Sequence, residues 1–348
     1  MNWKDPGAAD AGGAELYVSK VVELWAADGH EVVLMTPRGD GPRSPEGSVS
    51  RLRAGNRVTI FPRARRLLRR DGAHFDRVLE SVSTRPFFAH EFVGQRAVAL
   101  YHQVADDVWH QEYPGPVAYL GRRVVEPRWV RRMKTATVVA VSPSTASDLA
   151  RFGVCATGVV PPGNDPPPAV VQRSAPAAEP RVAFVGRLVH TKRPSDALEA
   201  FGAISSAFPG ATLDVIGAGY LEEKLRASAP PSVLVHGHLS EARKREILAS
   251  ADLVLCPGTR EGWGIVVMEA GAWGVPVVAY DIPGLRDAVV QGRTGILVPP
   301  SAAEMAAAAI RLLGDASTWR AMAFAGRQRA LDHSWRRSAD GLMAILAA

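Results

Sequence analysis

The sequence predicts an α/β protein of two domains, each built on a doubly wound parallel sheet. Short apolar runs, typical of buried strands, alternate with helical patterns along most of the 348 residues. A stretch rich in proline and alanine, 166–180, interrupts this alternation and is typical of a linker. We therefore expect an N-terminal domain over 1–165, a C-terminal domain over 181–334, and a closing amphipathic helix over 335–348.

The composition indicates a globular chain. Apolar residues make up 47% of it and charged residues 22%. No apolar run approaches the ~20 residues that span a bilayer, and the start, MNWKDPG, lacks the basic and apolar regions of a signal peptide. The two cysteines, Cys155 and Cys256, give neither a disulfide framework nor a metal-ligand cluster. We expect a cytoplasmic protein without a bound metal.

The net charge of +6 favours anionic partners. Basic residues gather in two runs, one over 63–70 and one over 122–134, where Trp129 and Met133 are interleaved with them. Each run fits either a solvated helix face or an interfacial helix on the inner, anionic face of a membrane. Nucleic acid is a poorer fit, because no recognition module accompanies the charge.

In the N-terminal domain a helix is predicted from Glu15 to about Ala27, with apolar residues at helical spacing. Gly12 and Gly13 precede it and would let the backbone approach a phosphate closely. Strands are expected over 31–36, 49–53, 58–61, 77–81, 97–102, 138–141 and 159–163.

The C-terminal domain is organised around 256–280, which reads as strand, loop, helix and strand. Glu261 lies in the loop and Glu269 in the helix, which is expected over 264–273. The free amides of 262–265 would direct the positive end of that helix at an anion, as suits a nucleotide diphosphate. Strands are expected over 181–185, 212–216, 233–236, 253–256, 275–280 and 295–298.

Two motifs carry a resemblance to a known family. Glu261 and Glu269, eight apart around GWG and followed by EAGAWGVPVVA, resemble the E-x7-E signature of the family 4 retaining glycosyltransferases. The segment 186–194, GRLVHTKRP, resembles the G-R-L…K-x-P motif of that family. The resemblance implies the GT-B fold: two Rossmann-like domains facing across a cleft, with the C-terminal helix returning to the N-terminal domain. The apolar first strand of the family is not found at the start of the chain, and Met1 stands where its last residue is expected, so either the start is misassigned or truncated or the domain lacks that strand.

The resemblance also implies roles. Arg187 and Lys192 would hold the diphosphate of a nucleotide sugar and stabilise its charge as it leaves. Glu261 would contact hydroxyls of the transferred sugar, and Glu269 would accept hydrogen bonds from the ribose. The backbone near His236 would hold the nucleobase. Further donor contacts are expected at Gly12, Gly13, Gly186, Gly262, Trp263, Gly264 and Ile265.

The acceptor side is predicted from fewer residues. His102 ends a strand at the functional edge of its sheet. It would contact the donor sugar or receive the acceptor's proton, and a structural histidine is the equal alternative. His110 and Glu112 follow and are candidate acceptor contacts, since this segment faces the cleft in family members.

The predicted activity is retaining transfer of a hexose or N-acetylhexosamine from a nucleotide diphosphate sugar to a hydroxyl acceptor, by front-face displacement. UDP is preferred on family frequency, and no cofactor or metal is expected. A sugar-nucleotide epimerase or hydrolase of the same fold is the nearest alternative. A non-catalytic protein that binds a nucleotide sugar or a membrane surface is the alternative of another class. A dehydrogenase is disfavoured, because 216–223 lacks the G-x-G-x-x-G fingerprint.

Overall fold

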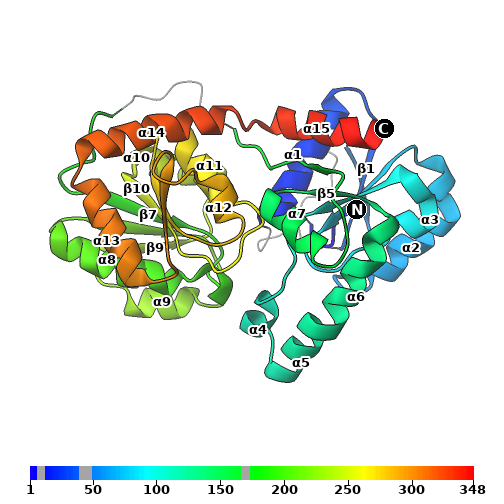
Figure 1. Ribbon diagram of the computed structural model, residues 1–348, viewed down its shortest axis with the longest axis horizontal. Helices are drawn as coiled ribbons and strands as arrows, with labels where there is room; N and C mark the ends of the chain where they lie inside the picture. The colour runs from blue at the N-terminus through cyan, green and yellow to red at the C-terminus, as the bar shows by residue number, and fades with distance from the viewer. Residues whose placement is uncertain (6–11, 39–48, 166–172) are drawn as a thin grey trace. The chain divides into compact units, whose positions relative to one another are not determined.

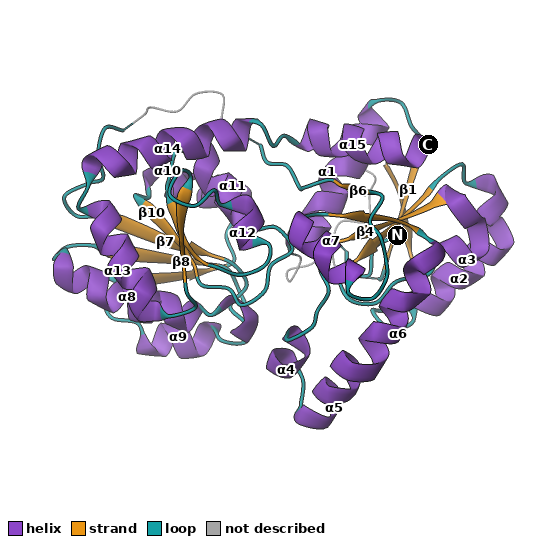
Figure 2. Ribbon diagram, in the orientation of Figure 1, coloured by secondary structure: helices purple, strands orange, loops and turns teal. Residues whose placement is uncertain are grey.

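The computed structural model describes residues 1–5, 12–38, 49–165 and 173–348. It divides into two compact units, one of Met1–Gly163 with Trp335–Ala348 (unit 1) and one of Asn164–Ser334 (unit 2). Each unit is an α/β layer structure on parallel strands (Figures 1 and 2), which confirms the predicted fold class. Of the expected linker, 166–172 lie outside the described residues, as do 6–11 of the N-terminal glycine-rich segment.

Unit 2 contains a six-stranded parallel sheet in the order β12-β11-β10-β7-β8-β9. Its central strands are apolar on both faces because helices cover both sides, as parallel sheets require. The strands are β7 (Arg181–Val185), β8 (Thr212–Ile216), β9 (Val233–Gly237), β10 (Leu253–Cys256), β11 (Val277–Tyr280) and β12 (Gly295–Val298). The helices are α8 (Pro194–Ala207), α9 (Glu222–Ser228), α10 (Glu241–Ser250), α11 (Ile265–Ala272), α12 (Leu285–Ala288), α13 (Ala302–Leu313) and α14 (Ala316–Leu331), with a short 3₁₀ turn η5 (His190–Lys192).

Unit 1 contains a four-stranded parallel sheet, β3-β4-β5-β6, and a parallel pair, β1-β2. The strands are β1 (Val32–Thr36), β2 (Val49–Arg53), β3 (Val78–Val82), β4 (Ala97–Tyr101), β5 (Thr137–Ala140) and β6 (Gly158–Val159). The helices are α1 (Gly13–Ala27), α2 (Ile60–Asp71), α3 (His90–Val93), α4 (Val108–Glu112), α5 (Gly115–Leu120), α6 (Glu126–Arg131), α7 (Pro143–Ala150) and α15 (Trp335–Ala347). Shorter turns are η1 (Gly72–His74), η2 (Gly94–Arg96), the π-helical η3 (Gly121–Val125) and η4 (Arg132–Thr135).

Residues 1–2 join the two sheets of unit 1. The Asn2 N–H donates to the Met35 carbonyl at 3.0 Å, and the Ser81 N–H donates to the Met1 carbonyl at 2.9 Å. This backbone therefore lies between β1 and β3, where the sequence predicted the end of the family's first strand.

The C-terminal helix α15 belongs to unit 1 and packs against α1 (Figure 1). The Trp25 indole N–H donates to the Ala339 carbonyl at 3.0 Å. Tyr17, fully buried, lies with its ring 5.7 Å from that of Trp335. This confirms the return of the C-terminal helix to the N-terminal domain. None of the helices in the described part of the chain is long and apolar enough to cross a membrane.

The strand expected over 58–61 is wrong, because helix α2 begins at Ile60. The Asn56 side chain accepts hydrogen bonds from the Val58 and Thr59 N–H groups, and the Ile60 N–H donates to the Asn56 carbonyl. This Asn turn starts a helix, and its buried residues recur at helical spacing as Ile60, Phe61, Ala64 and Leu68.

Candidate functional site

The loops after β7 and β8 in unit 2 are joined backbone to backbone. The Gly186 N–H donates to the Ile216 carbonyl at 3.0 Å, and the Leu188 N–H donates to the Ala218 carbonyl at 2.9 Å. Gly217 lies at φ +135°, and a Cβ there would approach the Gly186 oxygen to 1.9 Å. Only glycine fits this close approach. The segment that carries Arg187 is therefore fixed by its neighbour, while the Arg187 side chain is exposed.

Lys192 and Glu261 meet at the carboxyl edge of the sheet. The Lys192 ammonium donates to a Glu261 carboxylate oxygen, and the two side chains are 21% and 22% exposed. The Thr259 N–H also donates to the Thr191 carbonyl at 2.9 Å, which ties the two loops together. The structure thus brings together two residues that the sequence predicted for one site, 69 positions apart.

Cys256, at the end of β10, lies close enough to Lys192 and Glu261 for their charges to act on its thiol. Burial and, to a lesser degree, the Glu261 charge raise the pKa of its thiol to about 12, while the Lys192 charge opposes both. The thiol is therefore protonated at neutral pH and is a poor nucleophile. The sequence analysis did not predict that Cys256 would lie beside Lys192 and Glu261.

The loop of Glu261 leads into helix α11 through glycines. Gly264 is the N-cap, at φ +102°. A Cβ on Gly284, in the next loop, would lie 2.3 Å from the Glu261 carbonyl oxygen. The first amides of a helix lack intrahelical acceptors, so the start of α11, at Ile265 and just after Gly262, can face an anion.

Trp263, an expected donor contact, is buried. Its side chain is 6% exposed, and its ring lies 5.4 Å from that of His333. Its position holds the loop against the core, so a contact with a donor would come from the backbone.

Glu269 extends from α11 toward a lysine that sequence reasoning missed. Lys244, on α10, donates to Glu269 at 2.9 Å and lies 3.0 Å from Glu241. Burial lowers the pKa of Lys244, but the neighbouring carboxylates outweigh burial and raise it overall. Lys244 and Glu269 are 25 positions apart, so no local pattern indicates the pair.

The His236 side chain is turned to a buried carboxylate. Its Nε2 lies 2.7 Å from Asp214, which also binds Arg181 at 3.2 Å. Any contact of this strand end with a nucleobase would therefore come from the backbone, as the sequence analysis supposed.

In unit 1, Gly12 and Gly13 begin helix α1. Gly12 is the N-cap, and its N–H donates to the buried carboxylate of Glu15 at 2.8 Å. That amide is therefore occupied by the protein itself. The predicted role of these glycines near a phosphate stays a prediction.

His102 follows β4 and is buried, with 8% exposure. Its Nε2 lies 3.0 Å from the Ser81 hydroxyl, and burial lowers the pKa of the imidazole to about 3. A neutral ring in this environment is a weak proton acceptor, so the geometry favours a hydrogen-bonding or structural role over that of a general base.

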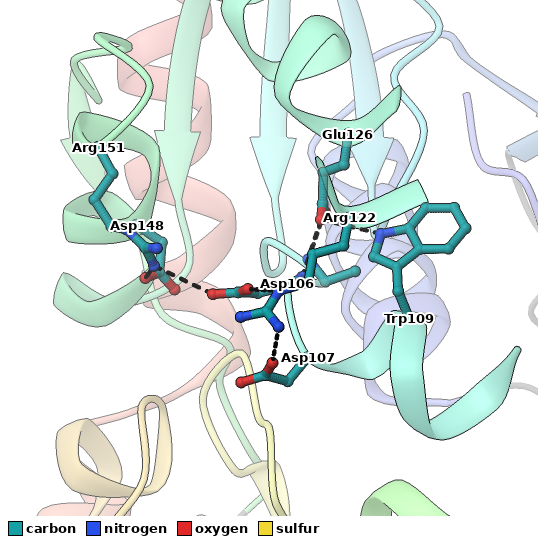
Figure 3. Close-up of polar contacts among 8 residues, drawn as sticks. Asp106, Asp107, Trp109, Arg122, Glu126, Asp148 and Arg151 are labelled. Carbon is teal, nitrogen blue, oxygen red and sulfur yellow. Dashed lines mark hydrogen bonds and ion pairs between the residues drawn. The ribbon is translucent and has the colours of Figure 1, made fainter. Parts of the chain in front are cut away.

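A buried glutamate positions the segment that follows His102. Glu126 accepts hydrogen bonds from the Ala105 N–H at 2.6 Å, the Asp106 N–H at 2.9 Å and the Trp109 indole at 3.1 Å (Figure 3). Burial raises the pKa of Glu126, against the effect of these donors. Asp106 holds φ +47° and is bound by the guanidinium groups of Arg122, at 2.7 Å, and Arg151, at 3.2 Å.

The acceptor candidates of the sequence analysis lie at the end of this segment, on α4. His110 is exposed and Glu112 is half-buried. Their helix is held by Glu126 through Trp109, and Glu126 was not singled out by the sequence.

Glu80, like Glu126, is a buried glutamate that holds a loop through hydrogen bonds, in this case the loop after β3. Its carboxylate accepts hydrogen bonds from the N–H groups of Phe87 at 2.6 Å, Phe88 at 3.0 Å and Ala89 at 3.2 Å. Burial raises the pKa of Glu80 to about 7, although the three amides oppose the shift. Phe88 is held at φ +62°, a conformation that an ordinary side chain rarely adopts.

Comparisons with known proteins agree with this architecture. The family model "Glycosyltransferase Family 4" matches residues 11–166, and the model "Glycosyl transferases group 1" matches residues 170–329. A glycogen synthase of Mycobacterium tuberculosis is 32% identical over 183 residues, which are 51% of this chain and 44% of that protein. A D-inositol 3-phosphate glycosyltransferase of Segniliparus rotundus is 36% identical over 204 residues, 53% of this chain and 45% of that protein. The matched part spans about half the length of these curated relatives or less.

Solved structures share the fold over nearly the whole chain. A sucrose-phosphate synthase from Thermosynechococcus elongatus has a TM-score of 0.75 at 20% identity, covering 99% of this chain and 96% of that one. Anabaena Alr3699/HepE, in complex with UDP and glucose, has a TM-score of 0.74 at 19% identity, covering 98% and 97%. These structures show the GT-B fold, and the two family models, which follow one another along the chain, identify the protein as a member of the family 4 glycosyltransferases.

Proposed function

We propose that the protein is a retaining glycosyltransferase that moves a hexose or N-acetylhexosamine from a UDP-sugar to a hydroxyl acceptor. The observation that carries the proposal is the Lys192–Glu261 pair on two joined loops beside the start of α11. A cation, a carboxylate and free helix amides at the carboxyl edge of a parallel sheet suit a sugar diphosphate. The choice of UDP is supported by Anabaena Alr3699/HepE, which has the same fold and was solved with UDP and glucose.

The donor would occupy unit 2. Lys192 and Arg187 would bind the diphosphate, whose negative charge grows as the bond to the anomeric carbon breaks. Glu261 would then exchange its contact with Lys192 for hydroxyls of the transferred sugar. Glu269, oriented by Lys244, would accept hydrogen bonds from the ribose.

The reaction would proceed by front-face displacement. The acceptor oxygen bonds to the anomeric carbon on the side from which the phosphate leaves, and its proton passes to the departing phosphate oxygen. A protonated Cys256 and a His102 with a pKa near 3 favour this route over a cysteine nucleophile or a histidine base. Arg187 and Lys192 would supply the charge stabilisation, so we propose that no metal or cofactor is needed.

A variant of Lys192 tests the proposal. Lys192→Ala should lower kcat/KM by about 10²- to 10³-fold, as for loss of one transition-state donor. Lys224→Ala, which removes an exposed lysine from α9, is the matched control and should leave kcat/KM unchanged. Both variants would be assayed by release of UDP from UDP-glucose and UDP-N-acetylglucosamine, with acceptor mixtures, in EDTA and in magnesium. Near-normal turnover in folded Lys192→Ala would refute the diphosphate assignment.

Product analysis separates the alternatives. Rapid consumption of donor without acceptor, or appearance of its epimer, would favour a hydrolase or epimerase. Saturable UDP binding without turnover under any acceptor would favour a binding protein. A strict need for magnesium would contradict the metal-independent route.

We also propose that the protein acts in the cytoplasm and contacts an anionic membrane through α2. Arg63 and Arg66 are exposed there and line a hollow of about 510 Å³ together with Met35, Leu52 and Leu67. Cations beside apolar side chains suit a lipid surface. The second basic run is a weaker candidate, because Arg122 is paired with Asp106 and Asp107, and Arg132 with Glu91. Sedimentation with phosphatidylglycerol vesicles but not with phosphatidylcholine vesicles is expected, and equal sedimentation with both would contradict the proposal.

A further inference from the structure

Three arginines from separate segments of unit 1 gather over aromatic rings. Arg65 lies on α2, Arg85 in the loop between β3 and α3, and Arg132 in η4 after α6. The guanidinium carbons of Arg65 and Arg132 lie 5.4 and 4.4 Å from the centre of the Phe88 ring. Such stacking leaves the edges of a guanidinium group, which carry its N–H donors, available for other partners.

Arg85 also stacks on aromatic rings, those of Phe61 and Trp129. Its guanidinium carbon lies 4.3 Å from the centre of the Phe61 ring and 5.6 Å from that of Trp129. Phe61 and Arg65 are four residues apart on α2 and so lie on the same helix face. The charge of Arg65 is close enough to lower the pKa of Arg85, in addition to the larger effect of burial.

The positive charge of this cluster is only partly neutralised. Arg132 is bound in a bidentate manner by Glu91, with Nη2 and Oε2 at 2.5 Å. Within residues 1–5, 12–38, 49–165 and 173–348, no carboxylate lies within ion-pair distance of Arg65 or Arg85. The Nε–H group of each is buried without an acceptor in the same residues. Two adjacent cations with unused donors are unfavourable unless an anion joins them.

The cluster lies at the carboxyl edge of the unit 1 sheet, beside His102. The loop of Arg85 follows β3, and Val82, the last residue of β3, is paired with Tyr101 just before His102. Glu80 fixes this loop through three backbone amides. Ser83 in the same loop has a buried hydroxyl without a partner among the described residues, and it can donate a further hydrogen bond. The donors are therefore held in place on a rigid support.

We propose that Arg65 and Arg85 bind an anionic group, a phosphate or a carboxylate, of the glycosyl acceptor. The inference rests on the proposed function, because it takes unit 1 as the unit that binds the acceptor. An oxyanion would bridge the two guanidinium groups, each of which offers Nε–H and Nη–H donors in a fork that matches two oxygens. The acceptor class is thus an acidic sugar or polyol rather than a neutral one.

The test is local to the two arginines. Inorganic phosphate is titrated into the full-length protein at constant ionic strength while the arginine Nε–Hε signals are followed by NMR. The signals are assigned by their loss in Arg65→Gln and Arg85→Gln. We expect both to shift with phosphate in the wild type. In Arg85→Gln, the affinity read from the Arg65 signal should fall at least about tenfold, as for loss of a charged hydrogen bond. Arg123→Gln, an exposed arginine of the same unit, should leave it unchanged.

Carbohydrate probes then identify the ligand chemistry. Glucose 6-phosphate or glucuronate should shift the two signals at concentrations where glucose does not, and the stronger of the two acids names the anion. Signals that stay fixed with phosphate and with both acids would overturn the inference and leave the arginines as packing groups.

The donor site is followed separately. UDP binding, measured by calorimetry, should be the same in the wild type and in Arg85→Gln, because Arg187 and Lys192 lie in unit 2. A wild type that binds phosphate at the two arginines but binds no UDP would overturn the proposed function and, with it, the assignment of this site to an acceptor. A wild type that binds UDP while the arginine signals stay fixed would overturn only the present inference.

Discussion

Replacing Glu80 with glutamine should remove a pH dependence from the stability of unit 1. Burial places the pKa of Glu80 at about 7 in the folded protein, against 4.5 for an ordinary glutamate. The folded state therefore binds more protons than the unfolded state between these values. The stability that a protonated Glu80 contributes is complete below pH 4.5 and is lost as the pH rises through 7. A shift of this size corresponds to about 3 kcal/mol.

The quantity to measure is the free energy of unfolding of wild type minus that of Glu80→Gln, from pH 4.5 to 8. Glutamine stays neutral, so this difference should fall by about 3 kcal/mol as Glu80 ionises in the wild type. Hydrogen exchange of peptides from β3 and β4 reports unit 1 by itself, while β10 peptides serve as an internal reference in unit 2. Glu23→Gln, an exposed glutamate on α1, is the matched control and should give a flat difference. A flat difference for Glu80→Gln as well would refute the reasoning, because the carboxylate would then be ionised at no net cost.

Further predictions concern backbone contacts. Gly217→Ala should destabilise unit 2 by about 3 kcal/mol or more and weaken UDP binding, because its Cβ would meet the Gly186 carbonyl oxygen at 1.9 Å. Gly202→Ala, with nothing within 4 Å of its Cβ on α8, should instead stabilise by roughly 1 kcal/mol; thermal unfolding of both variants checks the contrast, and equal effects would contradict it. Glu126→Gln should lower the hydrogen-exchange protection of the Ala105 and Asp106 amides by about 1–3 kcal/mol, because one acceptor oxygen is lost. Unchanged protection would show that Glu126 does not hold this segment.

Much of the fold could be predicted because its signals are local. The central strands of unit 2, such as 181–185 and 253–256, are short apolar runs buried on both faces, and periodicity finds them directly. The prediction of a strand over 58–61 was wrong because it also relied on this local signal. The apolar residues of this segment fit a short strand equally well, and only the Asn56 turn, together with the helical spacing beyond it, decides for a helix.

The site residues that could be predicted from the sequence are those that belong to short motifs of neighbouring residues. Lys192 and Glu261 belong to two motifs, and the structure places them in contact. Most partners of Glu80 and Glu126 are backbone amides, 7–9 positions from Glu80 and about 20 from Glu126, and backbone amides carry no sequence signal. Lys244 likewise resembles any helix lysine until α10 and α11 pack together.

The hydrogen bonds by which Glu80 and Glu126 hold their loops determine which amino-acid substitutions those loops can tolerate. Each carboxylate accepts hydrogen bonds from main-chain N–H groups, which every residue except proline possesses, so these bonds do not depend on the side chains of the residues that donate them; the Trp109 indole is the one side-chain donor to Glu126. Substitutions in 83–89 and 103–107, on the side that we propose binds the acceptor, can therefore change the side chains there without removing the hydrogen bonds that hold the loops. Phe88 and Asp106 are the exceptions, since their positive φ values restrict replacement to glycine, asparagine and the like. These loops of unit 1 can thus diversify by point mutation, while the loops of unit 2 where main chain packs on main chain at Gly217 have little freedom to vary.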